Sequence, residues 1–157
     1  MEEKLLTISY REYSSTSELS KEDQQLISQA EEAYKNAYAP YSHFHVGAVA
    51  LLDNGKTVVG NNQENVAYPS GLCAERVALF SVGANYPEAT VKTLAIAAKG
   101  DLVDKDAVLS PCGACRQVIF ESEKRQNSPI RILVKGLNGK VVEFHKSTDL
   151  LTFAFGL

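Results

Sequence analysis

Apolar residues near the amino terminus recur at every second position. They are Leu6, Ile8 and Tyr10, with the polar residues Thr7 and Ser9 between them. A period of two is typical of a strand, so we expect one over residues 6–10. The polar run that follows, 14–20, predicts a loop.

After this loop the apolar positions recur three and four residues apart. They are Leu26, Ile27, Ala30, Ala33, Tyr34 and Ala37, and they form one stripe of a helix. Ser20 precedes the stripe with Asp23 three residues on, a pattern that indicates a helix start. Pro40 predicts the end of this helix.

Two Asn-Gly pairs lie between apolar or β-branched runs, which is a strong sequence signal for a β-hairpin. Asn54-Gly55 predicts that a strand over 46–53 pairs with one over 56–62. Asn138-Gly139 predicts that a strand over 130–136 pairs with one over 140–145. Between the two hairpins, residues 93–98 are almost continuously apolar, as expected of a strand covered on both faces.

Helical stretches are expected over 73–86 and 112–123, on either side of the strand at 93–98. The predicted order is therefore helix, strand pair, helix, strand, helix, strand pair. This order indicates an α/β fold in which helices cover a single sheet, without repeats or linkers.

Composition and charge limit the classes of function. The chain has 157 residues, of which 45% are hydrophobic and 22% charged, so it is most simply one soluble domain. The net charge is -3 and the longest basic cluster is Lys124 with Arg125, which argues against a nucleic-acid partner. Residues 1–10 lack a long apolar segment, so we expect no signal peptide, no membrane partner and a cytoplasmic location.

The three cysteines fall in two short motifs, Cys73-Ala74-Glu75-Arg76 and Pro111-Cys112-Gly113-Ala114-Cys115. An odd number cannot pair completely within one chain, and metal binding or catalysis is the better prediction in a reducing compartment. Each motif begins a predicted helix, where the amides and the dipole favour thiolates. Three thiolates from Cys73, Cys112 and Cys115, with a fourth position open, are typical of a catalytic zinc site.

Glu75 follows Cys73 in the first turn of its predicted helix. Side chains there lean toward the helix amino terminus, so the carboxylate can reach the space beside the open metal position and transfer protons. Two alternatives remain. His43, His45 or His145 could complete a closed structural zinc site, and Glu75 could simply cap its helix.

The stretches "CAER", "PCGACRQ", "APYSHFHVGA" and "ENVAYPSGLCAER" resemble the homotetrameric zinc-dependent cytidine deaminases over residues 21–157. The resemblance implies a three-layer α/β/α sandwich with one five-stranded mixed sheet, one Zn²⁺ per subunit and a homotetramer. It also implies hydrolysis of cytidine and 2′-deoxycytidine to uridine and 2′-deoxyuridine with release of ammonia, as in pyrimidine salvage. Residues 1–20 are an N-terminal extension to which we assign no role.

The resemblance also implies roles for individual residues. Glu75 would move protons, and Arg76 would donate hydrogen bonds to the thiolates and withdraw charge from them. Substrate would be bound by the ring of Phe44, the side chains of Asn62 and Glu64 and the main chain of Ala74 and Ser110. Tyr68 and Phe155 would reach into the site of a neighbouring subunit. Gln63 departs from the family, whose members usually carry an apolar residue there.

Other functions remain open at this stage. A zinc module without activity would need a fourth protein ligand and would be indifferent to Glu75. A deaminase of another amino-heterocycle, such as a nucleoside antibiotic, fits the same motifs. A polynucleotide editor is disfavoured by the charge, and by Glu64, because a carboxylate needs a free hydroxyl as its donor. We therefore expect a small nucleoside substrate.

Overall fold

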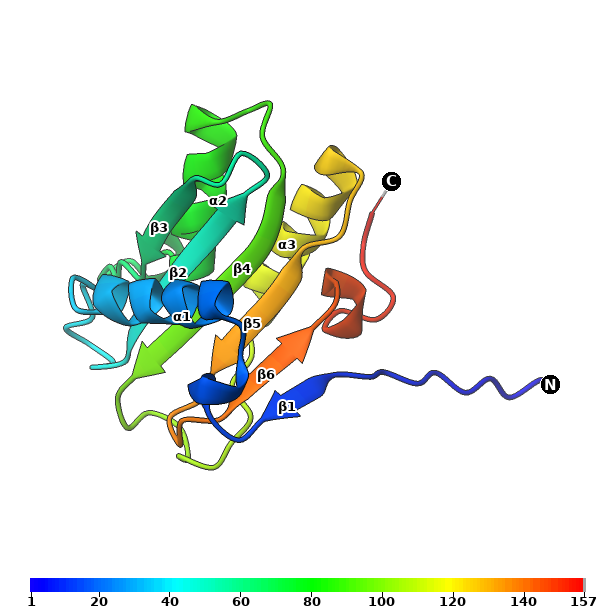
Figure 1. The fold of residues 1–157 in the computed structure, drawn as a ribbon, viewed down its shortest axis with the longest axis horizontal. Coiled ribbons are helices and arrows are strands. Elements are labelled where there is room, and N and C mark those ends of the chain that lie inside the picture. Colours follow the sequence, from blue (N-terminus) through cyan, green and yellow to red (C-terminus); the bar gives the residue numbers. More distant parts are fainter. Residues whose placement is uncertain (157) are drawn as a thin grey trace.

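The computed structural model describes residues 1–156, and Leu157, the last residue of the predicted catalytic region, lies outside them. The helices are α1 (Lys21–Tyr34), α2 (Ala74–Asn85) and α3 (Gly113–Gln126), with short 3₁₀ turns η1 (Thr16–Glu18), η2 (Tyr68–Ser70) and η3 (Ser147–Asp149). The strands are β1 (Arg11–Tyr13), β2 (His45–Leu52), β3 (Thr57–Asn61), β4 (Val91–Lys99), β5 (Arg131–Lys135) and β6 (Val141–Phe144). Figure 1 shows them as one sheet with helices on both faces.

The sheet of the described residues has the order β1-β6-β5-β4-β2-β3. Only β4 and β5 pair in parallel, with α3 as their crossover, and the other neighbours are antiparallel. The predicted mixed sheet is therefore confirmed. The expected number of five strands is wrong, because β1, from the predicted extension, adds a sixth strand at the edge beside β6.

The side chains of β4 alternate between two separate apolar layers. Leu94 and Ile96 pack in the layer under α2 and α3, whereas Ala95 and Ala97 pack in the layer under α1. Burial on both faces explains why this strand is apolar at successive positions. The predicted arrangement of helices around the sheet is confirmed (Figure 1).

Both predicted hairpins form, β2 with β3 and β5 with β6. In each turn the glycine has a positive φ, 80° at Gly55 and 87° at Gly139, a conformation that glycine adopts without strain. The Asn-Gly signal therefore located both turns.

Helix α1 begins as expected, because the Ser20 Oγ accepts a hydrogen bond from the Asp23 amide at 3.1 Å. The helix ends at Tyr34, earlier than Pro40 predicts. Ala37 lies in a turn in which its amide donates to the Tyr34 carbonyl. The apolar stripe therefore continues beyond the last helical residue.

The strand expected over residues 6–10 is wrong. In the structure the paired strand is β1, and Leu6, Ile8 and Tyr10 are exposed in the segment before it. Because β1 runs antiparallel to β6 with Arg11 opposite Glu143, Tyr10 stands opposite Phe144, and the residues before Tyr10 would pair beyond the end of β6, where the chain turns toward η3. The alternating pattern is present in residues 6–10, but β6 ends at Phe144 and offers no further residues for those before Tyr10 to pair with.

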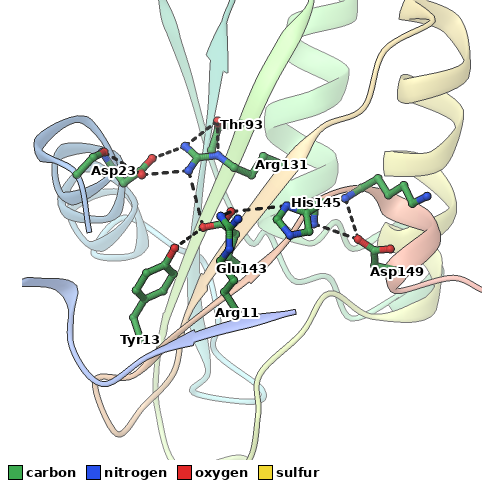
Figure 2. A network of polar contacts seen from close by, with 10 residues as sticks. Arg11, Tyr13, Asp23, Thr93, Arg131, Glu143, His145 and Asp149 are labelled. Atoms are coloured by element: carbon green, nitrogen blue, oxygen red, sulfur yellow. Dashed lines mark hydrogen bonds and ion pairs between the residues drawn. The ribbon is translucent and has the colours of Figure 1, made fainter. Parts of the chain in front are cut away.

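A polar network fastens β1 to the sheet (Figure 2). At its centre is Glu143 of β6, which is only 2% exposed. Its carboxylate accepts hydrogen bonds from Arg11 Nη1 at 3.1 Å and from the Tyr13 hydroxyl at 2.8 Å. Arg131 of β5 lies 3.9 Å away on the other side and also binds Asp23 of α1. The network joins β1, β5, β6 and α1 at one edge of the fold.

None of the helices formed by residues 1–156 combines the length and the apolar character needed to cross a bilayer.

Candidate metal and catalytic site

The two cysteine motifs meet at the amino-terminal ends of α2 and α3. Cys73 and Cys112 are the residues that cap these helices, and Cys115 lies in the first turn of α3. The three sulfur atoms all lie within 4.8 Å of one another, with 3.8 Å between Cys73 Sγ and Cys112 Sγ. Two thiolates bound tetrahedrally at about 2.3 Å from one zinc would stand about 3.8 Å apart, so the spacing fits Zn²⁺.

A glycine in β3 brings the start of α2 close to the sheet. A Cβ atom at Gly60 would lie 2.5 Å from the Ala74 carbonyl oxygen and 2.5 Å from the Ala78 amide nitrogen. Any other residue would push the first turn of α2 outward, and the Cys73 thiol with it. Gly60 therefore sets the position of one of the three sulfurs.

The three thiols form an electrostatically coupled group. Donation by the Cys115 thiol, together with contacts from Arg76 and Cys112, lowers the pKa of Cys73 to about 5. The same hydrogen bond, burial and the nearby Glu75 carboxylate raise the pKa of Cys115. Cys73 is therefore a thiolate at neutral pH, which gives the site a soft anionic ligand.

Arg76 lies against the cluster as expected. Its Nη2 is 3.8 Å from Cys73 Sγ and 3.1 Å from the Gly71 carbonyl oxygen. Its Nε is buried and, within residues 1–156, has no hydrogen-bond partner. The Nη2 group of Arg76 thus contacts a sulfur, and its Nε group remains available to donate to an acceptor in the metal-loaded site.

Glu75 is 5% exposed and faces the same space as the sulfurs. Burial raises the pKa of its carboxyl group, and the Cys73 thiolate adds to that effect. A carboxyl group with a raised pKa beside a metal site is suited to accept and return protons. Its position at the second residue of α2 agrees with the geometry expected from the sequence.

A cavity of about 370 Å³ opens over this cluster. Besides the cysteines, five of its lining residues were expected at the site: Phe44, Asn62, Glu64, Glu75 and Ser110. Cys73 and Cys112 also line it, whereas Cys115 is fully buried behind them. A second cavity, of about 420 Å³, adjoins the first, because Ser42, Asn62, Glu64 and Cys73 line both.

Asn62 and Glu64 also hold the loop that carries Phe44. The Asn62 amide donates to the Phe44 carbonyl at 2.9 Å and accepts from the Val46 amide at 2.8 Å. The Glu64 carboxylate accepts from the Tyr41 amide at 2.9 Å and from the Ser42 hydroxyl at 2.5 Å. Although burial opposes it, these hydrogen bonds lower the pKa of Glu64, so it is a carboxylate at neutral pH.

The other expected residues differ in exposure. Ala74 is fully buried between Cys73 and Glu75, so only its main chain can contribute. Tyr68 and Phe155 are 77% and 83% exposed, respectively. Tyr68 borders the second cavity, where its ring stands 6.3 Å from that of Tyr41. The structure therefore places Tyr68 beside the site and leaves both rings accessible.

The histidines stand apart from the thiols. The metal-binding group found among the described residues consists of the three cysteines alone. His45 Nδ1 lies 3.2 Å from the His43 carbonyl oxygen, and His145 belongs to the polar network around Glu143. These positions weigh against a closed site with a histidine as the fourth ligand.

Sequence reasoning missed most of the cavity wall. Val46 and Ile96 form part of it, with Leu102 and Leu109 from the irregular segment before α3. Pairing of β2 with β4 brings the first two together, and the sequence does not reveal that pairing. Arg116, which follows Cys115 directly, was also missed, although it binds Ser110.

Comparison with known proteins gives a consistent result. Residues 20–128 match the family model described as "Cytidine and deoxycytidylate deaminase zinc-binding region". The chain is 44% identical over 132 residues to the cytidine deaminase of Halalkalibacterium halodurans, covering 84% of this chain and 92% of that one. It is 42% identical over 135 residues to that of Mycobacterium tuberculosis, covering 82% and 85%. The crystal structure of cytidine deaminase from Burkholderia pseudomallei is similar, with a TM-score of 0.70, 34% identity and coverage of 87% and 100%.

Proposed function

We propose that this chain hydrolyses cytidine and 2′-deoxycytidine to uridine and 2′-deoxyuridine with release of ammonia. The chain belongs to the family of cytidine and deoxycytidylate deaminases, and this membership supports the proposal. One observation carries the proposal. A single cavity brings the buried Glu75 carboxyl and the sulfurs of Cys73 and Cys112 to the same space as the Phe44 ring. That cavity has room for a nucleoside, because ligand sites commonly measure about 300–1,000 Å³.

The thiolates of Cys73, Cys112 and Cys115 would hold a Zn²⁺ ion, which would supply an activated water near neutral pH. Glu75 accepts a proton from this water as the oxygen attacks the ring carbon that bears the exocyclic amine. The carboxyl gives this proton to the ring nitrogen, then takes the proton of the new hydroxyl on the ring carbon and gives it to the amine, which leaves as ammonia while the carbonyl forms. Its burial supports these transfers, because bulk water does not compete for the proton.

Arg76 adjusts the charge of the metal ligands. Three thiolates give Zn²⁺ a net charge of about -1, which weakens its effect on the water. The guanidinium beside Cys73 Sγ withdraws electron density from that sulfur, and its buried Nε is a further donor. We propose that Arg76 maintains the acidity of the site.

Binding of the nucleoside is assigned to the other lining residues. Phe44 stacks on the base, the main chain of Ala74 and Ser110 contacts the pyrimidine edge, and Asn62 and Glu64 bind the ribose hydroxyls. The carboxylate and amide retain lone pairs and a hydrogen for this role while they hold the loop 41–46. Ribose binding would therefore stabilise the loop that carries the stacking ring.

A nucleoside panel tests the proposal. Purified full-length protein loaded with zinc is incubated with cytidine, 2′-deoxycytidine, 2′-deoxycytidine monophosphate, a cytosine-containing nucleoside antibiotic and single-stranded DNA. Loss of cytosine absorbance is followed in each case. We expect turnover of the two free nucleosides. Turnover of only the monophosphate, the antibiotic or the oligonucleotide would contradict the assignment.

We further propose a homotetramer whose sites are shared between chains. The exposure of Tyr68 and Phe155 supports it, because large apolar rings in contact with solvent are suited to an interface. Light scattering should give four times the 17.1 kDa chain mass. An active monomer would exclude shared sites.

The free thiols also bear on location and domain limits. Three unpaired cysteines next to one another are typical of proteins in a reducing compartment, which supports the expected cytoplasmic location. We retain residues 21–157 as the catalytic region, with the 1–20 extension providing the edge strand β1. The family match, which begins at residue 20, supports this division.

A further inference from the structure

Arg116 makes three hydrogen bonds from one guanidinium group. Its Nε donates to the Pro111 carbonyl at 2.7 Å, its Nη1 to the Leu150 carbonyl at 2.8 Å, and its Nη2 to the Ser110 hydroxyl at 2.7 Å. Each donor points to a different acceptor, and the acceptors lie in two chain segments. Only the planar, forked group of arginine can make all three contacts at once.

The first of these segments lies directly before the metal ligand Cys112. Ser110 lines the cavity, yet it lies outside the helices and strands, at the end of an irregular segment over residues 100–112. Pro111 has no amide hydrogen, so this position cannot add a donor to fix the segment. Arg116 lies in α3, and its hydrogen bonds hold both Ser110 and Pro111.

The second segment is the C-terminal one, which begins after η3. Leu150 is held by Arg116, and the neighbouring residue of α3, Gln117, donates from Nε2 to the Phe155 carbonyl at 2.8 Å. Two successive residues of α3 thus bind both ends of the segment 150–155. Helix α3, which carries Cys115, therefore fixes both the cavity wall and the segment 150–155 through the side chains of Arg116 and Gln117.

We propose that Arg116 is a positioning residue of the substrate site. It sets the main chain of Ser110 against the pyrimidine and links that contact to the C-terminal segment. The inference rests on the proposed function, in which the Ser110 main chain contacts the base. Arg116 itself touches neither substrate nor metal, and it acts through Ser110.

A positioning role differs from a stabilising one in what it changes. A displacement of about 1 Å at a substrate contact can lower turnover about 100-fold without unfolding the protein. Loss of a bond that only stabilises the fold would lower the melting temperature and leave both kcat and KM unchanged. The readout is therefore kcat/KM for cytidine, measured beside zinc content and the melting temperature.

The experiment compares Arg116→Gln, Arg116→Lys, Ser110→Ala and the double variant Arg116→Gln with Ser110→Ala. Arg125→Gln is the matched control, because Arg125 is an exposed arginine in the last turn of the same helix and outside the cavity. Zinc is quantified by elemental analysis of each full-length protein. Steady-state kinetics with cytidine and thermal melting follow.

We expect Arg116→Gln to keep one zinc per chain and to lower kcat/KM about 10- to 100-fold. Arg116→Lys should fall between this variant and the wild type, since an ammonium can replace only part of the fork. Ser110→Ala should lower kcat/KM by a few-fold alone and have no further effect in the Arg116→Gln background, because coupled residues are not additive. Arg125→Gln should match the wild type.

Three results would overturn the inference: unchanged kcat/KM in Arg116→Gln, additive effects in the double variant, or loss of zinc from Arg116→Gln. If Arg116→Gln fails to fold, Arg116→Lys and Ser110→Ala test the inference in its place. Wild-type kinetics in both of these variants would reject the positioning role of Arg116. A wild-type protein that fails to deaminate cytidine would instead refute the proposed function. The two failures are therefore distinguishable.

Discussion

Two buried polar groups of this protein differ in how completely their atoms are paired. The Glu143 carboxylate at the sheet edge has Arg11 and Tyr13 on one side and Arg131 on the other, and Asp23 closes the network (Figure 2). At the cavity, by contrast, three thiols face one another, and a buried guanidinium nitrogen of Arg76 has no partner within residues 1–156.

This difference separates structural from functional polar groups. A buried charge with several partners is satisfied and holds elements together, as the edge network does for β1. A cluster that leaves donors and soft anions facing a cavity is typical of a site that binds an additional partner, here zinc and a substrate. Changes at the network should therefore affect unfolding, and changes at the cavity should affect metal binding and turnover.

The largest effect is expected for a ligand of the metal. Cys112→Ala removes one of three sulfurs, and two thiolates do not make a catalytic zinc site. Zinc content should fall well below one per chain and deamination below detection. Elemental analysis of protein prepared without chelators tests this, with Glu121→Ala, an exposed residue of the same helix, as the control. Retention of a full zinc in Cys112→Ala would remove Cys112 from the ligand set.

Glu75→Gln is expected to have the next largest effect. Glutamine preserves size and hydrogen bonding but cannot carry protons, so zinc content and nucleoside binding should persist. Turnover should fall by about 10⁴-fold, since one carboxyl serves several proton transfers. Steady-state kinetics and a melting curve measure both properties. If Glu75 only caps its helix, the variant would stay active and lose about 1 kcal/mol of stability.

The edge network should respond in the opposite way. Glu143→Ala removes the buried acceptor of the network and leaves Tyr13 and the half-buried Arg131 with fewer partners, so we expect the free energy of unfolding to fall by about 2–4 kcal/mol. Turnover per folded, zinc-loaded chain should not change. Glu12→Ala is the matched control, because Glu12 lies between Arg11 and Tyr13 in β1 and pairs with Lys140 at an exposed position. That loss should be below about 1 kcal/mol. Equal losses of unfolding free energy in Glu143→Ala and Glu12→Ala would show that burial of Glu143 does not determine how much the network stabilises the fold.

The smallest effect concerns pH. Its hydrogen bond to Glu143 raises the pKa of the Tyr13 hydroxyl, so the folded state favours the protonated phenol. The stabilisation is complete below the ordinary tyrosine pKa of about 10 and is lost as pH rises through the raised value. Wild type should exceed Tyr13→Phe by about 1 kcal/mol at pH 8, and the difference should shrink above about pH 10. Tyr38→Phe, an exposed tyrosine, is the control in urea unfolding, and a gap that persists at pH 11 would contradict the assignment.

The two regions also differ in how far the sequence predicted them. Cys73, Glu75, Cys112 and Cys115 lie in two short motifs at helix starts, where spacing and local geometry already predict which side chains meet. The pairing of the two motifs needed only the expectation of one shared metal. The resemblance to a known family then supplied Phe44, Asn62, Glu64 and Ser110, whereas the apolar part of the cavity wall was not predicted.

The edge network could not be predicted in this way. Tyr13 and Glu143 are 130 positions apart, and Asp23 and Arg131 are 108 apart, so no local pattern relates them. The strand expected at 6–10 failed for the same reason, because the length of β6 decides which residues pair. Alternation predicts that a segment can form a strand, whereas the partner determines where it does.

The two chain ends offer unequal places to attach a tag, dye or surface tether. Figure 1 shows the first ten residues running away from the sheet, and Leu5 and Leu6 are exposed there. The opposite end is bound to α3 through Gln117 and Arg116, directly behind the cavity wall. An amino-terminal attachment therefore lies away from these contacts, whereas a carboxy-terminal one would stand next to the contact between Gln117 and Phe155.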